Sequence, residues 1–322
     1  MHVGISEILR ERDDLAGAAQ HLDEARDLGE ENGLPQNAYR SRVAAARIRQ
    51  AEGDPEAALE LLAEAGRLYT NDFSPDVRPV DALKARVWIA QRRLSEATGW
   101  ARAAGVSATD DLSYVREFEH VTLARLLLAQ GIRDRSDDAT GAAIDLLERL
   151  LAAAEHGGRT GSAIEILVLQ ALARRARKEV PAAIVSLERG LALAEPEGYV
   201  RVFADEGPPM AAMLRLTAGH RDGSGYLRLL LAVAAAAPAA RAAVDQLLIE
   251  PLSERELEVL RLLESDLAGP DIARELSVSL ATVRTHTRNV YAKLGVNNRR
   301  SAVRRAAELG LLSRSGSDRA GA

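Results

Sequence analysis

Paired amphipathic segments dominate the first 200 residues of the chain. The second segment of each pair follows a turn and repeats Ala–Leu or Ala–Ile pairs at helical spacing, as in the stretch from Gly53 to Tyr69. The pattern recurs at spacings of 39, 46 and 40 residues when four alanines are aligned, namely Ala58, Ala97, Ala143 and Ala183. Small residues let paired helices pack closely, and one hairpin cannot bury its apolar face alone. The repeats therefore predict helical hairpins stacked into a solenoid.

Several positions within these repeats have a predicted role. Pro55 and Pro181 suit the first turn of a helix. Two more helices are expected after the repeats, one from Pro208 through Leu214 and one over about 226–236. A broad buried stripe is expected at Phe118, Val121, Leu123, Leu126 and Leu128. Four aromatic residues suit either core packing or the lining of a ligand groove, namely Tyr69, Trp88, Trp100 and Tyr114.

The composition favours an all-α protein. Aromatic residues make up only 3% of the chain, whereas the good helix formers Ala, Leu, Arg and Glu are frequent. Cysteine is absent, which excludes disulfides, thiolate metal sites and Cys nucleophiles. The sequence shows neither a secretory leader nor an apolar run of membrane-spanning length. We therefore expect a soluble, cytoplasmic protein without membrane contact.

Signatures of common enzyme sites are missing from the sequence. It has no G-x-S-x-G elbow and no G-x-G-x-x-G loop, and G-x-x-x-x-G-K-[ST] cannot occur because no lysine follows a glycine. The six histidines lack a metal-binding spacing, and the aspartate pairs at 110–111 and 137–138 suit helix caps and loops. The sequence therefore predicts no enzymatic activity, no cofactor and no metal.

The C-terminal region carries start and stop signals of short helices. Ser253 and Glu256 form an S-x-x-E capping pattern, and Gly269 and Pro270 suit an N-cap and a first-turn position. A further helix is expected to begin after Ser279 and to end at the glycine of the sequence K-L-G-V. Two helices joined by a short turn, of which the second is basic, are typical of a helix-turn-helix.

The second of these helices has one face suited to a duplex. Residues 277–307 hold seven Arg or Lys side chains and no carboxylate, although the net charge of the chain is −5. A solvated face would mix both signs, whereas phosphate repels carboxylates. At about 100° per residue, the core side holds Val283, Thr287, Val290 and Leu294. The opposite side holds Ala281, Thr285, Arg288 and Ala292, flanked by Thr282, Arg284 and Asn289. Arg, Asn and Thr can contact guanine, adenine and the thymine methyl group in a major groove.

Residues 252–312 resemble the C-terminal DNA-binding domain of the LuxR family, through the T-V-R-x-H core, the Y-x-K-L-G-V exit and the closing E-L-G-L-L. The resemblance implies base contacts by Arg284, Thr285 and Arg288, and the helical wheel places Asn289 beside them. It implies contacts with the DNA backbone by Thr282, Lys293 and Arg299. It also implies that the last helix, over 300–309, forms a dimer contact through Ala302, Val303, Ala306 and Leu309.

Two departures from the family pattern concern phosphate binding. Ala268, Gly269 and Pro270 stand where the family commonly has a Ser-Asn-Lys type entry, so a cap hydroxyl and a phosphate-binding Lys are missing. Asn297 and Asn298 precede the last helix where R-S-R is common, which leaves a single Arg. Affinity from this side is expected to be weaker.

The upstream region, from about residue 36, resembles the helical-repeat region of the large ATP-dependent LuxR regulators related to the activator of the maltose regulon. The likeness rests mainly on residues 197–214 and on the order of the parts. Such regulators carry an ATPase domain before the repeats. The chain therefore resembles the C-terminal part of such a regulator, or a short relative without the nucleotide switch.

The expected architecture is all-α. It comprises a tetratricopeptide-like solenoid at 1–237, a linker at 238–251, a four-helix LuxR-type helix-turn-helix domain at 252–312 and a flexible tail at 313–322. We expect a transcriptional regulator, as an activator, that binds a double-stranded DNA operator as a homodimer. An unknown inducer or protein would bind the repeats, and RNA polymerase is a further candidate partner. The alternative is a non-enzymatic scaffold whose end domain contacts RNA polymerase or another protein.

Overall fold

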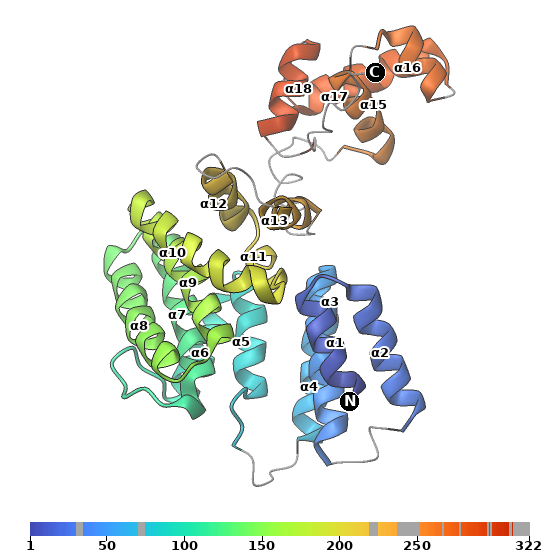
Figure 1. The fold of residues 1–322 in the computed structure, drawn as a ribbon. Helices are drawn as coiled ribbons and strands as arrows, with labels where there is room; N and C mark the ends of the chain where they lie inside the picture. The colour runs from blue at the N-terminus through green and yellow to red at the C-terminus, as the bar shows by residue number, and fades with distance from the viewer. Residues whose placement is uncertain are drawn as a thin grey trace. The chain divides into compact units, whose positions relative to one another are not determined.

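The chain folds into two compact units, Met1–Ala234 and Ala235–Ala322. The computed structural model describes residues 1–29, 35–69, 75–218, 225–236, 252–265, 267–276, 278–294, 296, 298–308 and 311. The expected linker at 238–251 and tail at 313–322 lie outside these residues. Every element within the described ranges is a helix, which confirms the predicted fold class (Figure 1). None of these helices is both long and apolar enough to cross a membrane.

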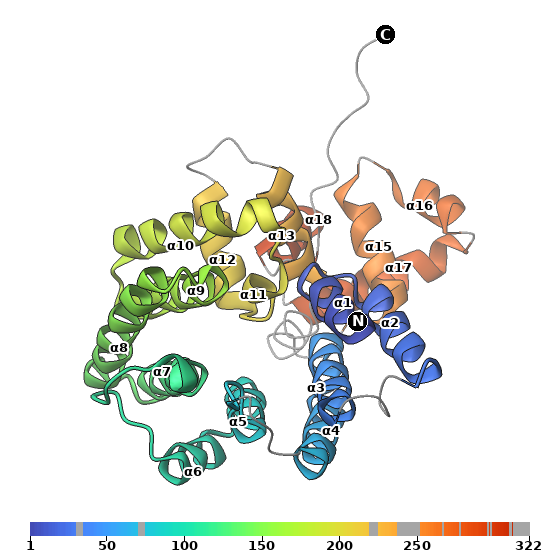
Figure 2. The ribbon, with the colours of Figure 1, turned by 60° about the horizontal axis from the view of Figure 1, so that its bottom comes forward.

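Helical hairpins build most of the first unit (Figures 1 and 2). The hairpins pair α1 (His2–Glu11) with α2 (Leu15–Asp27), α3 (Pro35–Glu52) with α4 (Pro55–Leu68), α5 (Val80–Ala90) with α6 (Leu94–Ala104), α7 (Glu117–Asp134) with α8 (Asp137–His156), and α9 (Thr160–Ala176) with α10 (Val180–Ala194). Helices of one hairpin pack on each other, and contacts between α2 and α3, α4 and α5, α6 and α7, and α8 and α9 link successive hairpins. The four hairpins after residue 35 confirm the predicted repeats. The first hairpin lies within the solenoid predicted at 1–237, but its two helices were not assigned individually from the sequence.

All five hairpins turn in the same way. The residue before the N-cap of the second helix has left-handed backbone, with φ of 69° at Asp13, 88° at Gly53, 60° at Arg92, 52° at Arg135 and 65° at Lys178. In each case the N–H of the following residue donates to the carbonyl five residues earlier, at 2.8–3.0 Å. This is the Schellman arrangement that ends a helix. The second helix begins directly after this turn. In three hairpins a side chain caps it by accepting one of its first N–H groups, and these caps are Asp14, Asp54 and Ser136.

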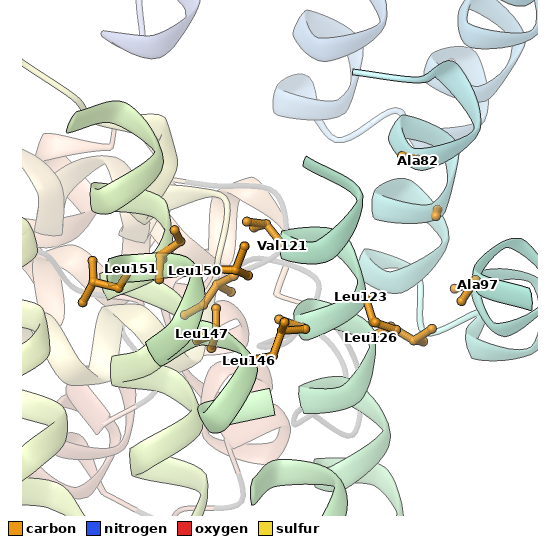
Figure 3. Packing of buried hydrophobic residues seen from close by; sticks show 14 of the residues in the cluster. Ala82, Ala97, Val121, Leu123, Leu126, Leu146, Leu147, Leu150 and Leu151 are labelled. Carbon is orange, nitrogen blue, oxygen red and sulfur yellow. The ribbon is translucent and has the colours of Figure 1, made fainter. Parts of the chain in front are cut away.

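The alanines that define the repeat are buried in the apolar clusters between helices. Ala58, Ala97, Ala143 and Ala183 are all 0% exposed. Ala97 shares one apolar cluster with leucines of α7 and α8, and Figure 3 shows Leu123, Leu126, Leu146 and Leu150 of this cluster. The small side chains therefore set the distance between helices, and the leucines fill the core on either side.

The predicted stripe on α7 is confirmed at Val121, Leu123, Leu126 and Leu128, which are all buried. Phe118 is only partly buried, because it faces a charged cluster on α5, α7 and α9. The Arg86 guanidinium lies 3.7 Å from the centroid of the Phe118 ring and donates to Glu165 at 2.7 Å. Arg125 donates to the same carboxylate at 2.9 Å.

The four aromatic residues considered for a groove are not brought together. Trp100 is buried in the core between α5, α6, α7 and α8, and Trp88 packs at its edge. The Tyr69 ring lies edge-on to Tyr39, with 5.1 Å between ring centroids, and Tyr114 is 59% exposed. The packing role therefore fits Trp88 and Trp100, and no shared groove forms among these described residues.

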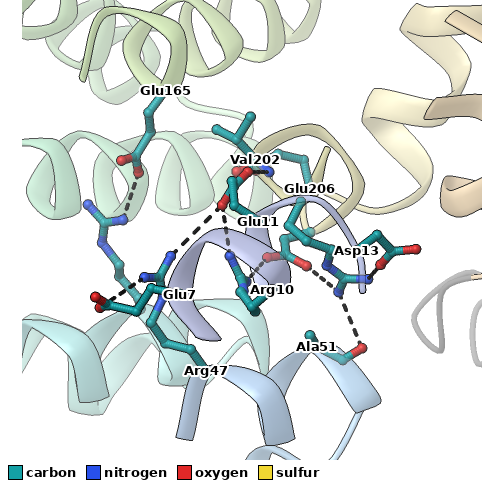
Figure 4. A network of polar contacts seen from close by, with 12 residues as sticks. Glu7, Arg10, Glu11, Asp13, Arg47, Ala51, Glu165, Val202 and Glu206 are labelled. Carbon is teal, nitrogen blue, oxygen red and sulfur yellow. Dashed lines mark hydrogen bonds and ion pairs between the residues drawn. The ribbon is translucent and has the colours of Figure 1, made fainter. Parts of the chain in front are cut away.

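The first hairpin contacts the end of the repeat region. After α10, the chain forms the short helix α11 (Arg201–Ala204), which lies against α1 (Figure 4). Val200 N–H donates to the backbone carbonyl of Glu11 at 3.0 Å, and Val202 N–H donates to the Glu11 carboxylate at 2.8 Å. Two segments about 190 residues apart in sequence are thus joined by one backbone hydrogen bond and by one from a backbone N–H to a carboxylate.

A buried arginine strengthens this closure. Arg201 is 5% exposed, and its guanidinium donates to Asp13 at 2.9 Å and to the Ala51 carbonyl at 3.2 Å. It also pairs with Asp205, which in turn pairs with Arg10 of α1 (Figure 4). Each buried charge therefore has an opposite charge and hydrogen-bond partners, as burial of ions requires.

Two helices complete the first unit as predicted. These are α12 (Pro208–Ala218) and α13 (Gly225–Ala236). Met210, Met213 and Leu214 of α12 are 0% exposed, and they pack in one cluster with Leu227 and Leu230 of α13. Part of the apolar face left by the last hairpin is thereby covered, because this cluster also contains side chains of α9 and α10.

Candidate nucleic-acid interface

Four helices form the described part of the second unit. They are α15 (Glu254–Glu264), α16 (Gly269–Glu275), α17 (Leu280–Leu294) and α18 (Arg299–Glu308). Helix α17 contacts each of the other three helices, and α15 also contacts α18. Two apolar clusters hold them together, one around Val259, Leu263, Ile272 and Val283 and one around Leu260, Val290 and Leu294. The order and lengths match the predicted helix-turn-helix, with α16 and α17 on either side of its turn.

Side-chain caps fix where these helices begin. Ser253 Oγ accepts from Glu256 N–H at 3.3 Å, and the Glu256 carboxylate accepts from Ser253 N–H at 2.8 Å, which confirms the capping box. Ser279 Oγ accepts from Thr282 N–H at 3.1 Å, as predicted. The expected end of α17 at Gly295 lies outside the described residues.

The start of α16 differs by one residue from the prediction. Ala268 is the N-cap, so Gly269 is the first helical residue and Pro270 the second. The cap contact comes from Asp271, whose carboxylate accepts from Ala268 N–H at 3.3 Å. Three residues into the helix, Asp271 thus supplies half of a capping box even though Ala268 has no hydroxyl.

The two faces of α17 lie as the helical wheel predicted. Val283, Val290 and Leu294 are 0–5% exposed, and Thr287 is partly buried. The opposite face is exposed within the unit: Ala281, Arg284, Thr285, Arg288, Asn289 and Ala292. Thr285 Oγ1 donates to the carbonyl of Ala281 at 3.1 Å, so the hydroxyl is hydrogen-bonded within its own helix.

Three side chains on this face have hydrogen-bonding groups that are exposed and without a partner in the part of the chain that the structure describes. Within the described parts of the chain, Arg284, Arg288 and Asn289 form no hydrogen bond or ion pair. Elsewhere in the molecule, arginines commonly pair with a carboxylate three or four residues away, as Arg255 does with Glu258 at 2.6 Å. Helix α17 contains no carboxylate that could do so.

Comparison with known proteins places both units. Residues 1–218 match the family described as "MalT-like TPR region", and residues 250–306 match the family described as "Bacterial regulatory proteins, luxR family". The chain belongs to the MalT-like TPR family. Its C-terminal unit matches the luxR-type regulatory family and has the order of helices of a helix-turn-helix domain, and it follows a helical-repeat region.

One curated relative shows how local the similarity is. The "HTH-type transcriptional regulator MalT" of Serratia proteamaculans (strain 568) is 48% identical over 59 residues. These residues are 18% of this chain and 6% of the relative, so the aligned part covers a small fraction of that protein. No solved structure matches the chain.

Two of the residues predicted to contact the DNA backbone have partners inside the luxR-type domain. Lys293 Nζ donates to the Glu256 carboxylate at 2.8 Å, and the Lys293 side chain is 17% exposed. Burial raises the pKa of Glu256, but the hydrogen bonds from Lys293 and Ser253 have a larger combined effect in the opposite direction. The pKa of Glu256 therefore lies below its usual value. Lys293 thereby ties α17 to the start of α15.

Arg299 ties α18 to the end of α15 in a similar way. Its guanidinium donates to the carbonyls of Leu263 at 2.9 Å and Leu267 at 2.7 Å, and also to Ser265. Carbonyls at a helix C-terminus lack partners within the helix and attract a cation. The predicted phosphate contact by this guanidinium is therefore not supported by its position. Thr282, the third predicted residue, is partly buried, and its hydroxyl is hydrogen-bonded to Ser279.

The predicted dimer contact needs a correction. Ala302 and Ala306 are 0% exposed, because they pack against Leu260, Val290 and Leu294 inside their own domain. These two residues have no surface to offer a second chain. Val303 is partly buried, and Leu309 lies outside the described residues. The sequence correctly predicted an apolar face on α18. That face packs against the core of its own domain.

Proposed function

We propose that the chain is a transcriptional regulator that reads double-stranded DNA by laying the exposed face of α17 in the major groove. The observation that carries this proposal is that Arg284, Arg288 and Asn289 on that face have no hydrogen-bond partner among the residues that the structure describes. An arginine can donate two hydrogen bonds to guanine, and an asparagine can pair with adenine in the same groove. Thr285 is exposed on the same face, and its methyl group suits contact with the thymine methyl group.

Contacts with the DNA backbone are proposed to come mainly from positive charge around α17. Thr282 stands at the start of α17, where N–H groups and the helix dipole favour a phosphate. Lys293 and Arg299 would act differently from the original prediction. They hold α15, α17 and α18 together and add to the positive field without a direct phosphate contact.

The regulator is proposed to bind its operator as a homodimer. A single domain of this size presents one short helix to the groove, whereas two copies can read half-sites about ten base pairs apart. The operator would then have approximate two-fold symmetry. Val303 and Leu309 remain the candidate contacts, since Ala302 and Ala306 are committed to the core.

The MalT-like TPR region is proposed to bind an inducer or a protein in the cytoplasm and thereby to control activation of transcription. Stacked hairpins expose an extended surface, and such surfaces suit the binding of a peptide, protein or ligand. Contact with RNA polymerase would follow from operator binding. No enzymatic step is required of the chain for this role.

A titration of the full chain with duplex DNA at rising salt tests the proposal. A DNA reader loses affinity linearly in logarithmic terms, with a slope of about −0.9 for each phosphate neutralised. Probes with one and two half-sites enter the same titration, and we expect the paired site to bind more tightly. Affinity for DNA that is absent or independent of salt would favour the scaffold that contacts RNA polymerase. Equal affinity for both probes would contradict the dimer.

A further inference from the structure

Three potential metal ligands converge in the first hairpin. His2 Nδ1 lies 3.0 Å from His21 Nδ1, and each of these nitrogens lies 3.0 Å from the Glu24 carboxylate oxygen Oε2. His2 belongs to α1, whereas His21 and Glu24 belong to α2. The latter two are three residues apart and therefore share one face of their helix. The three atoms form a nearly equilateral triangle between the two helices.

The chemistry of this triangle suits a divalent transition metal. Imidazole nitrogen and carboxylate oxygen are both common zinc ligands, with bonds of about 2.0–2.2 Å. Ligand atoms at that distance from a tetrahedral ion lie about 3.4 Å apart, which small rotations of the three side chains would provide. The side chains of His2, His21 and Glu24 are 19%, 29% and 39% exposed, so the site is open to solvent. A water molecule can then complete the coordination.

A neighbouring side chain orients the Glu24 carboxylate. Gln20 Nε2 donates to the other carboxylate oxygen of Glu24, Oε1, at 2.9 Å, and this leaves Oε2 for the imidazoles. Partners that orient a ligand in this way are typical of metal sites.

We propose that His2, His21 and Glu24 bind a divalent first-row transition metal, with Zn²⁺ as the natural probe, and that the ion ties α1 to α2. The sequence did not predict this site because the two histidines are 19 residues apart and converge only when the hairpin forms. Since α1 also contacts α11, a bound ion would stabilise the helix through which the repeat region closes. This inference does not depend on how the regulator reads DNA.

Calorimetric titration of the full chain, purified without a histidine tag and freed of metal with a chelator, tests the proposal. We expect one Zn²⁺ per chain and no measurable binding of Mg²⁺, which prefers oxygen ligands. His21→Ala and Glu24→Gln should each weaken Zn²⁺ binding more than about 100-fold, and Gln20→Ala by about 10-fold. His156→Ala is the matched control, because His156 is exposed on α8 and should leave the affinity unchanged.

A second readout covers variants that fold poorly. The melting temperature of the wild type should rise with Zn²⁺, whereas that of Glu24→Gln should not, and both are compared in chelator. Co²⁺ in place of Zn²⁺ should give the visible absorption of a site with nitrogen and oxygen ligands. Zn²⁺ affinity that is the same in wild type, His21→Ala and Glu24→Gln would overturn the proposal. If the wild type shows no saturable Zn²⁺ binding, the three side chains are held by hydrogen bonds alone. That result would also overturn the proposal.

Discussion

At the scale of single residues, the luxR-type domain depends on charges that the fold has partly buried. Glu256 is 3% exposed and holds both the N-cap of α15 and the ammonium group of Lys293. Breaking a buried pair leaves one charge without its partner, which costs more free energy than the pair contributes. The exposed face of α17 differs in its use of charge, since its arginines are exposed and unpaired within the described residues.

Lys293→Met should lower the free energy of unfolding of this domain by about 3 kcal/mol near neutral pH, because Glu256 loses its cation. The pKa of Glu256 is lowered in the folded protein, so its stabilising contribution is present above its unfolded pKa and is lost as the pH falls through the lowered value. The difference between variant and wild type should therefore shrink in acid. Hydrogen exchange of the α15 amides in the full chain, at neutral and acidic pH, measures this difference in the free energy of unfolding.

Arg274→Met provides the control for this prediction. Arg274 pairs with Asp271 of its own helix, and its side chain is 80% exposed, so its loss should change stability by less than about 0.5 kcal/mol. Equal effects of the two substitutions, or an effect of Lys293→Met that does not depend on pH, would contradict the role given to the Lys293–Glu256 pair.

Much of the interface could be predicted at the residue scale, and the errors have a common cause. Local sequence spacing was sufficient to predict the helix caps at Ser253 and Ser279 and the core face of α17. The positions of Arg299 and Ala302 depend on which other helix packs nearby. A helical wheel shows that a face is apolar or basic, but it does not show whether that face meets the core or a second molecule.

At the scale of elements, the hairpins share one turn geometry that requires a left-handed residue. Gly53 occupies this position between α3 and α4 with φ of 88°. Gly53→Ala should lower the free energy of unfolding by about 1 kcal/mol, because a Cβ disfavours this backbone conformation. Thermal unfolding of the full chain measures the change.

Gly99→Ala is the matched substitution of opposite sign. Gly99 lies within α6, and an added Cβ there would have no atom within 4 Å. Alanine is a better helix former than glycine, so the free energy of unfolding of this variant should rise by about 0.5–1 kcal/mol. The same sign of change in both variants would contradict the account of the turns.

The sequence predicted four of the five hairpins because each has a strong Ala–Leu pattern after its turn. The first hairpin has a weaker signal, with Ala18, Leu22 and Ala25 as the buried positions of α2 and only Val3 as a buried aliphatic residue of α1. Part of its stability comes from polar contacts with α11 instead. Those contacts depend on tertiary structure, so no local pattern could indicate them.

At the scale of the whole molecule, the first unit is closed by contacts between its two ends. Arg201→Ala should lower the free energy of unfolding of this unit by about 3 kcal/mol, because it leaves Asp13, Asp205 and the Ala51 carbonyl without their shared donor. Arg12→Ala is the control, since Arg12 is exposed and its one hydrogen bond within the described part of the chain is a 3.4 Å contact with the Glu197 carbonyl. Thermal unfolding in which both variants behave like wild type would contradict the closure.

The central claim is that the exposed face of α17 selects base pairs, and selection of bound sequences from a random duplex pool tests it most directly. Wild type and Arg288→Ala are compared with Arg261→Ala, which removes an equal charge from the exposed side of α15. We predict that Arg288→Ala loses about 2 kcal/mol of discrimination at one base pair of the selected site, whereas Arg261→Ala keeps the same preferences. Recovery of the same preferences by Arg288→Ala would contradict the claim.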